Sequence, residues 1–342
     1  MRALFRTEAN RRIGTGHLRR CALIADALHQ RGVQVSFALP ELPESLMGDF
    51  HHTMVSIPME DDEVRFLSWL AQSFVKENTV VITDTDRLIH RSPSFQSRVR
   101  SAGYSLMSIT FCGGSHWQSD WVLNTNPRAL DLVYAGSGHT RFLLGARFMA
   151  IRPEFRDLRC SRTSRSAPEE VLIAFGGADA TDQTLLALEG IATCRGFRLR
   201  TMIATGPLYQ SHDLLRAVLQ KLPGLQAVVH NNTPNIASLM ARAVFGIVSP
   251  GTAFFELCCL GVPALLISTS EREREAAAWL EQHECCIYLG HAGSVSAKQV
   301  GDAVDRLLHE PELRKTLTTR VRAMVDGGGV SRIVDALATG FR

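Results

Sequence analysis

Short apolar runs alternate with amphipathic stretches along nearly the whole chain, and this order constrains the fold more than any other feature. Residues 3–6 are a strand candidate, and helical spacing follows at Leu18, Cys21, Ala22, Ala25 and Leu28. Gly32 ends that helix before the next strand candidate, residues 33–39, so the segment forms one β-α-β unit. Repeated units of this kind predict an α/β protein with parallel sheets.

The alternation continues with one break. Further strands are predicted at residues 80–82, 105–109, 121–123, 171–175, 198–204, 227–230, 244–248 and 264–268, and helices at 236–243 and 300–308. The break is the segment 156–168, which is polar, basic and without a period. We therefore predict two doubly wound, Rossmann-like domains, residues 1–157 and 168–342, which face a cleft, and the last helix could pack back on the amino-terminal domain.

Charge and composition exclude several classes of protein. The chain has 37 basic and 34 acidic side chains, and a net charge of +3 gives no strong field for a polyanion, so nucleic acid is not an expected partner. Arg6 interrupts the amino terminus after three apolar residues, so we expect no signal peptide and a cytoplasmic protein. The eight cysteines show no C-x-x-C spacing and are expected as reduced thiols, mostly in the core.

The most hydrophobic window, residues 251–268, is about long enough to span a bilayer. It contains Glu256 in its middle, and Gly261-Val262-Pro263 follows. These residues predict a helix, a turn and a strand in place of a membrane span.

A glycine loop with a histidine lies between the first strand and the first helix. Gly14 and Gly16 let the backbone approach a ligand, and the helix amino terminus offers unpaired N–H groups to an anion. His17 follows directly, where the helix dipole disfavours an imidazolium, so we expect a neutral ring that can accept a proton. A capping histidine would fit the same position equally well.

Two more glycine turns follow strands in the second half. Gly176 and Gly177 open a turn toward a ligand, and Asp179 is expected to cap the next helix. Gly251 and Thr252 feed a helix that could hold a diphosphate. Glu256, one turn into that helix, could accept both hydroxyls of a ribose, although a buried structural hydrogen bond is the competing interpretation.

Other polar candidates carry less information. Asp84 follows a strand and could bind sugar hydroxyls or a cation, but a turn is the more frequent reason for an aspartate there. The histidines show no zinc spacing, so we expect neither a metal site nor a cofactor.

Taken together, these motifs resemble the PseG family, the nucleotide-sugar hydrolases of pseudaminic acid biosynthesis, which are related to the SpsG group of spore-coat polysaccharide proteins. The residues that carry the resemblance are Ile13-Gly14-Thr15-Gly16-His17 with Arg19, Leu144-Gly145 leading to Arg152-Pro153-Glu154-Phe155, Phe175-Gly176-Gly177-Ala178-Asp179, Gly206-Pro207, and Glu256 with Gly261-Val262-Pro263. They keep their order over nearly the whole chain, and they are much more specific jointly than singly.

The resemblance implies the two-domain GT-B fold, which MurG-like glycosyltransferases share, and a UDP-linked diacetamido-trideoxy sugar as substrate. It implies that His17 activates the attacking water and that the carboxy-terminal domain holds the nucleotide. The substrate-binding residues it suggests are Gly14, Gly16, Arg19, Asp84, Arg152, Gly176, Gly177, Gly251, Thr252 and Glu256.

The chain departs from the family pattern in the expected sugar shell. Asp86 replaces a tyrosine, Phe111-Cys112-Gly113-Gly114 replaces a pair of aspartates, Ser249-Pro250 replaces part of a glycine-rich turn, and Ser270-Glu271-Arg272 replaces an Asn-Gln pair. Either the sugar or the activity therefore differs. A metal-independent nucleotide-sugar hydrolase is the leading hypothesis; a GT-B glycosyltransferase and a nucleotide-sugar-binding protein without catalysis are the alternatives.

Overall fold

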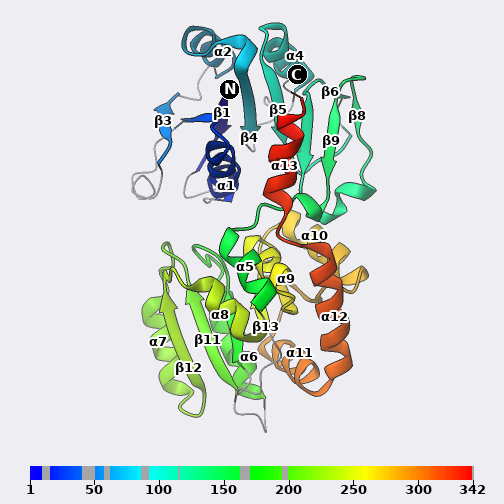
Figure 1. The fold of residues 1–342 in the computed structure, drawn as a ribbon. Helices are drawn as coiled ribbons and strands as arrows, with labels where there is room; N and C mark the ends of the chain where they lie inside the picture. The colour runs from blue at the N-terminus through cyan, green and yellow to red at the C-terminus, as the bar shows by residue number, and fades with distance from the viewer. Residues whose placement is uncertain are drawn as a thin grey trace. The chain divides into compact units, whose positions relative to one another are not determined.

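The computed structural model describes residues 1–9, 16–40, 51–57, 62–85, 92–114, 116–161, 170–194 and 199–340. By its contacts the chain divides into two compact units (Figure 1). Unit 1 comprises Met1–Ala150 and Gly328–Arg342, and unit 2 comprises Ile151–Gly327.

Unit 1 is built on a seven-stranded parallel sheet in the order β3-β2-β1-β4-β5-β7-β9. Its strands are β1 (Arg2–Thr7), β2 (Gln34–Leu39), β3 (Thr53–Ser56), β4 (Thr79–Asp84), β5 (Ser105–Ile109), β7 (Trp121–Asn124) and β9 (Arg141–Leu144). A two-stranded sheet joins β6 (His116–Trp117) to β8 (Ala135–Gly136). Every residue of β4 is buried, as expected for a central strand of a parallel sheet covered on both faces.

Helices cover both faces of this sheet. Helix α1 (Gly16–Gln30) and helix α13 (Gly329–Ala338) share one apolar core with it, and α2 (Asp62–Ser73) and α4 (Pro93–Ser101) contribute to the other. Short 3₁₀ helices lie at η2 (Lys76–Asn78), η3 (Pro127–Asp131) and η4 (Ala146–Phe148). The chain enters α13 at Gly329, where a Cβ would lie 2.2 Å from the carbonyl oxygen of Met149, so only glycine allows this approach.

Unit 2 has a six-stranded parallel sheet in the order β12-β11-β10-β13-β14-β15. Its strands are β10 (Glu170–Ala174), β11 (Arg200–Thr205), β12 (Gln226–Asn231), β13 (Ala243–Val248), β14 (Ala264–Ser268) and β15 (Ile287–His291). Its helices are α5 (Pro153–Ser161), α6 (Gln183–Thr193), α7 (His212–Lys221), α8 (Ile236–Arg242), α9 (Thr252–Leu260), α10 (Glu271–Gln282), α11 (Ala297–His309) and α12 (Pro311–Met324).

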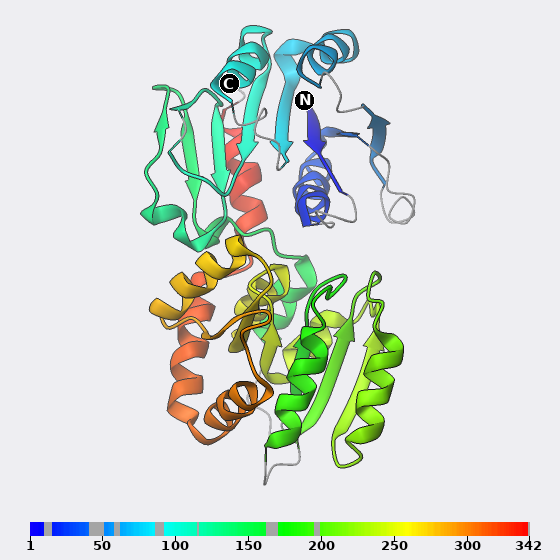
Figure 2. The ribbon, with the colours of Figure 1, turned by 180° about the vertical axis from the view of Figure 1, so that it is seen from behind.

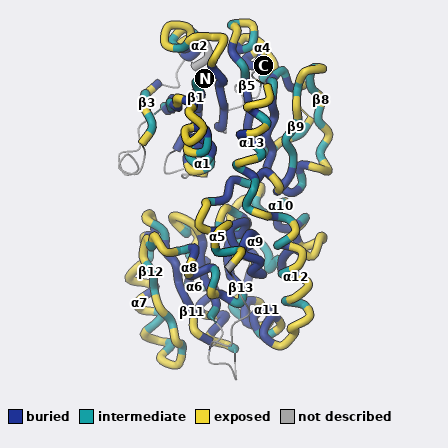
Figure 3. Tube along the Cα trace, in the orientation of Figure 1, coloured by how far each residue is buried: buried dark blue, intermediate teal, exposed yellow. Residues whose placement is uncertain are grey.

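The helices of unit 2 also lie on both faces of the sheet. Helices α6 and α7 cover one face (Figure 2), and α8 and α9 lie on the other (Figure 1). Helix α6 packs closely on α11 because Gly190 and Gly301 meet there; a Cβ on Gly190 would come within 2.5 Å of Val300. Figure 3 shows that buried residues gather along the strands, whereas the outer sides of α7 and α12 are exposed.

In each unit the order of the strands reverses next to the first strand. The reversal lies between β1 and β4 in unit 1 and between β10 and β13 in unit 2. Loops that leave the carboxyl ends of two such strands run in opposite directions and open a crevice for a ligand. The loops in question are those before α1, after β4, after β10 and after β13.

The α/β class and the parallel sheets predicted from the sequence are confirmed, and each predicted strand overlaps an observed one. Arg198, expected to start a strand, lies outside the described residues. The window 251–268 forms α9, a turn at Gly261 with φ of 71°, and β14, as predicted. No helix among the described residues is both long and apolar enough to cross a bilayer.

Five strands differ from the prediction because none was expected there: the half-buried edge strands β3, β9 and β15 and the two-residue strands β6 and β8. Residues 156–168 also differ from the expected linker, because α5 extends to Ser161. Arg159 explains the helix: its guanidinium donates to the carbonyl oxygens of Cys259, Val325 and Arg322 at 2.7–2.9 Å. Such contacts attach α5 to unit 2, so the contact division falls at Ala150–Ile151.

Candidate active site

A histidine–aspartate pair lies at the strand reversal of unit 1. His17 belongs to the first turn of α1, and Asp84 is the last residue of β4. Nδ1 of His17 lies 2.6 Å from Oδ1 of Asp84, and the two residues are 5% and 1% exposed. The contact joins residues 67 positions apart in the chain because β1, which leads into α1, pairs with β4 up to Thr7 and Asp84.

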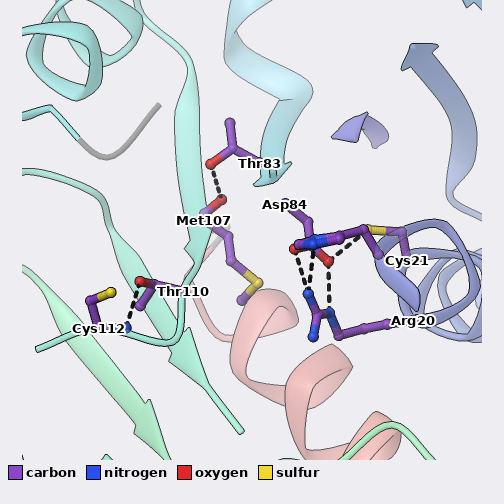
Figure 4. Close-up of polar contacts among 8 residues, drawn as sticks. Arg20, Cys21, Thr83, Asp84, Met107, Thr110 and Cys112 are labelled. Atoms are coloured by element: carbon purple, nitrogen blue, oxygen red, sulfur yellow. Dashed lines mark hydrogen bonds and ion pairs between the residues drawn. The ribbon is translucent and has the colours of Figure 1, made fainter. Parts of the chain in front are cut away.

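Arg20 binds the same carboxylate in a forked geometry (Figure 4). Its Nε donates to Oδ2 of Asp84 at 2.7 Å and its Nη2 to Oδ1 at 2.6 Å. The thiol of Cys21 donates to Oδ2 at 3.4 Å. Two parallel N–H bonds to one carboxylate are among the strongest polar contacts in proteins, so Arg20 fixes the plane of the Asp84 carboxylate.

Asp84 is ionised in this arrangement. Burial alone would raise the pKa of its carboxyl, but the charge of Arg20 and the hydrogen bond from His17 outweigh burial and hold the pKa well below its usual range. Burial, with the negative charge of Asp84, raises the pKa of the Cys21 thiol well above its ordinary value. The thiol is therefore neutral and acts as a hydrogen-bond donor.

The ionised Asp84 decides which ring nitrogen of His17 carries the proton. A carboxylate without a proton can only accept, so the 2.6 Å contact requires the hydrogen on Nδ1 of His17. Nη2 of Arg20 lies 3.1 Å from the same nitrogen, but a protonated Nδ1 cannot accept from it, so this Arg20 nitrogen donates to Oδ1 of Asp84 instead. The lone pair of a neutral His17 ring is thus on Nε2, which suits the ring to accept a proton there.

The aromatic ring of Phe111 packs against His17 and Arg20. Its ring meets the His17 ring edge-on, with centroids 6.4 Å apart and an interplanar angle of 87°, and the guanidinium of Arg20 lies 4.8 Å from its centroid. Phe111 follows β5, the strand next to β4. An aromatic ring lowers the local dielectric and strengthens the charge interactions beside it.

A second group of sequence-predicted residues lies at the strand reversal of unit 2. Gly251 precedes α9 without a side-chain cap, Thr252 is exposed in the first turn, and Glu256 is 4% exposed one turn later. Oε1 of Glu256 accepts from Nε of Arg152 at 2.8 Å. Burial alone would lower the pKa of Arg152, but the hydrogen bond and charge of Glu256 raise it. Glu256 thus has the partner that a carboxylate in an apolar helix requires.

The glycine turn after β10 is open to solvent. A Cβ added at Gly176 or Gly177 would meet no atom within 4 Å. Asp182, and not the predicted Asp179, occupies the N-cap position of α6, but the Asp179 carboxylate accepts from the backbone N–H groups of Gln183 and Thr184, each at 2.9 Å. Burial raises the pKa of Asp179.

The structure thus gathers the sequence-predicted residues into groups within each unit. His17 and Asp84 meet in unit 1, Arg152 and Glu256 meet in unit 2, and Gly14 lies outside the described residues. Gly16 and Arg19 are exposed at the start of α1. Among the described residues, no group of three or more His, Cys, Asp or Glu side chains is arranged to hold a metal ion.

The sequence alone does not single out Arg20, and it marks Phe111 only as a departure from the family pattern. Arg20 lies three positions after His17 on the helix, so it shares a face with the histidine, whereas Arg19 points to solvent. The helical spacing of His17, Arg20 and Cys21 was the signal that could have found it. Nothing in the sequence indicates the contact between Phe111 and His17, because only the order of neighbouring strands brings the two rings together.

Two α/β units, each built on its own parallel sheet, are the architecture of the GT-B class of glycosyltransferase-like folds. The chain matches the structure of MurG from Acinetobacter baumannii with a TM-score of 0.71 at 14% identity, over 99% of this chain and 100% of that one. It matches the calicheamicin glycosyltransferase CalG4 with a TM-score of 0.65 at 13% identity, over 99% and 97%. A UGT from Siraitia grosvenorii in complex with UDP matches with a TM-score of 0.63 at 12% identity, over 98% and 100%.

In sequence the chain is similar to the spore coat polysaccharide biosynthesis protein SpsG of Bacillus subtilis strain 168, at 25% identity over 203 residues and 58% of this chain. It is 31% identical over 141 residues, 40% of this chain, to an uncharacterized protein of Methanocaldococcus jannaschii. The matches span 59% and 29% of the lengths of these two relatives. No protein-family model matches the chain.

Proposed function

We propose that this protein is a nucleotide-sugar hydrolase in which His17 is the general base. The substrate is a UDP-activated diacetamido-trideoxy sugar of pseudaminic-acid-type surface glycan synthesis, and the products are UDP and the free sugar. The observation that carries the proposal is the His17–Asp84 contact of 2.6 Å, which leaves Nε2 of His17 as the proton acceptor.

The reaction follows from this pair. Nε2 of His17 removes a proton from a water molecule, and the water oxygen forms a bond to the anomeric carbon of the sugar. The bond between that carbon and the diphosphate oxygen breaks, and UDP leaves with the electron pair. Asp84 stabilises the imidazolium through Nδ1–H, and Arg20 keeps the carboxylate in place.

Unit 2 supplies the nucleotide site in this proposal. The uncapped amino terminus of α9, with Gly251 and Thr252, suits a diphosphate, and Glu256 with Arg152 suits the ribose. Gly176 and Gly177 contribute backbone that a ligand can approach. Gly14, Gly16 and Arg19 remain proposed substrate contacts in unit 1.

The similarity to SpsG supports a role in polysaccharide biosynthesis, and the UDP-bound structural neighbour supports a uridine nucleotide. The small exposed area of His17 favours water as the nucleophile, because an acceptor sugar needs more room around the base.

A glycosyltransferase is the second candidate, and the glycosyltransferases among the structural neighbours favour it. In that reaction His17 removes the proton of an acceptor hydroxyl. The third candidate, a nucleotide-sugar-binding protein without catalysis, is favoured by the altered residues around Phe111.

Incubations without and with an added acceptor separate the three candidates. The protein is mixed with a panel of UDP-, GDP- and CMP-sugars, first without any acceptor and then with one added. Released sugar and nucleotide are separated and quantified. Free sugar and UDP in equal amounts support the hydrolase. Turnover that needs an added acceptor indicates the transferase, and binding without turnover under both conditions indicates the binding protein.

A further inference from the structure

Three buried polar atoms at the carboxyl ends of β10 and β11 have no hydrogen-bond partner in the part of the chain that the structure describes. They are Oη of Tyr209, Oδ1 of Asp182 and Oε1 of Gln183. Tyr209 and Gln183 are only 5% and 4% exposed, and all three atoms are closed off from water. A buried polar group without a hydrogen-bond partner destabilises the folded state. Three such atoms in two neighbouring loops therefore indicate a place where a ligand could supply the partners.

The loop after β10 also has two residues with left-handed backbone. Asp179 and Asp182 have φ of 43° and 51°, in the left-handed region that side chains other than glycine, asparagine and aspartate rarely adopt. The Asp179 carboxylate stabilises this conformation, because it accepts from two backbone N–H groups in the first turn of α6. Left-handed residues other than glycine cluster at active sites and at segments that contact ligands.

The loops after β10 and β11 are connected by a backbone hydrogen bond, and the glycines of the first loop face open space. The backbone N–H of Leu208 donates to the carbonyl oxygen of Gly177 at 2.9 Å, and a Cβ on Gly206 would lie 2.4 Å from Cα of Gly177. Gly176 and Gly177 themselves have free space where a Cβ would be. A ligand can therefore approach these loops along the backbone of Gly176 and Gly177.

The charges around Tyr209 define what can bind. Burial, and then the negative charges of Asp179 and Asp182, raise the pKa of Tyr209 to about 12. The phenol is therefore a neutral donor, and two carboxylates lie close enough to repel an anion. The available groups are one donor and two acceptor oxygens, which suits a neutral ligand with hydroxyl groups.

We propose that Tyr209, Asp182 and Gln183 form a hydroxyl-binding subsite that is closed in the free protein and opens to the hydroxyl groups of a nucleotide sugar. The Tyr209 hydroxyl then donates to a ligand oxygen, and Asp182 and Gln183 accept from ligand hydroxyls. The inference rests on the proposed function, and it assigns these loops to the ribose or the hexose and not to the diphosphate.

Tyr209→Phe tests the subsite because it removes one hydroxyl. The thermal midpoint of the free variant should be unchanged or higher, since the lost group had no partner. Its affinity for a ligand that uses the subsite should fall about 5- to 30-fold, the scale of one or two lost hydrogen bonds. A merely structural hydroxyl predicts the reverse: a lower midpoint with unchanged affinity.

Three probes in calorimetric titrations identify the ligand group. A loss seen with both UDP and UDP-N-acetylglucosamine assigns the subsite to the ribose, and a loss with UDP-N-acetylglucosamine alone assigns it to the hexose. Inorganic pyrophosphate should bind wild type and variant equally. An equal loss for pyrophosphate overturns the assignment to hydroxyl groups, and unchanged affinity for all three probes overturns the subsite.

Asp182→Gly provides a second test, with Glu284→Gly as the matched control. Both residues have left-handed backbone, with φ of 51° and 54°, so glycine should raise the thermal midpoint in each variant. Only Asp182→Gly should weaken UDP or UDP-N-acetylglucosamine binding. Equal effects of the two variants on affinity contradict the proposal. If the wild-type protein binds neither nucleotide probe, the proposed function fails as well. If the wild-type protein binds them and the variants bind equally well, only the subsite proposal is overturned.

Discussion

The carboxylate of Asp84 and the Nδ1 atom of His17 lie 2.6 Å apart in a nearly solvent-free contact, with Arg20 forked onto the same carboxylate. A permanently ionised acceptor on one side of an imidazole directs its lone pair to the other side. The contact with Asp84 therefore favours a general base over a helix cap as the role of His17.

His17→Asn should retain the fold and lower turnover of the substrate by about 10²- to 10⁴-fold, the usual scale for a lost general base. The asparagine amide can still donate to Asp84, so the change removes Nε2 with little loss of the buried contact. UDP release per folded molecule, UDP affinity and the thermal midpoint are the measurements. A stable variant with normal turnover would overturn the mechanism.

Asp84→Asn should lose stability in a pH-dependent way. The pKa of Asp84 is lower in the folded protein than in the unfolded chain, so its ionised form stabilises the fold above about pH 4. As the pH falls below that value, the unfolded chain takes up the proton first and the advantage of the wild type shrinks. Denaturant titrations of both proteins from pH 7 to pH 3 should show this gap narrowing. A gap that stays constant would mean that the carboxylate is not held ionised.

Arg20→Met should lower the free energy of unfolding by about 3–5 kcal/mol, because it leaves the buried Asp84 carboxylate without its cation. Arg19→Met, one residue earlier and exposed, is the matched control and should stay within about 0.5 kcal/mol of wild type. Turnover should fall in the first variant, whereas Arg19→Met is a control for stability alone, because Arg19 is itself a proposed substrate contact. Arg20→Lys should lose less stability and less turnover than Arg20→Met but should not reach the wild-type values, since an ammonium cannot make the forked contact.

Glu256→Gln should weaken UDP binding by about 1–3 kcal/mol if its carboxylate accepts ribose hydroxyls. Stability should change less than affinity, because the side chain of Arg152 is 34% exposed and can be solvated once the charge is lost. The control is Glu154→Gln, which removes the other, more exposed carboxylate partner of Arg152. Equal affinities of the two variants for UDP would return Glu256 to a structural role.

Arg159→Met should lower the free energy of unfolding by about 2–4 kcal/mol, because three carbonyl oxygens lose their donor at once. Arg156→Met changes an exposed residue of the same helix and should have a much smaller effect. Urea denaturation followed by circular dichroism compares them. Similar losses in both variants would show that the guanidinium contacts of Arg159 add little.

The sequence alone determined the local features: strands, helices, glycine turns, and the positions of His17 and Glu256 beside them. These follow from short-range periodicity and from the few residues that tolerate turns, so they need no knowledge of the fold. The α/β class followed in the same way, because repeated β-α units have few ways to cover a parallel sheet.

Only the tertiary structure decided which distant residues meet. The pairing of β1 with β4 brings Asp84 to His17, and the neighbouring strand brings Phe111 to His17 and Arg20. The choice between Arg19 and Arg20 depends on which face of α1 packs against the sheet, and adjacent residues on a helix point about 100° apart. Strand order and helix rotation are set by burial of apolar surface over the whole unit, and a linear pattern of residues does not contain that information.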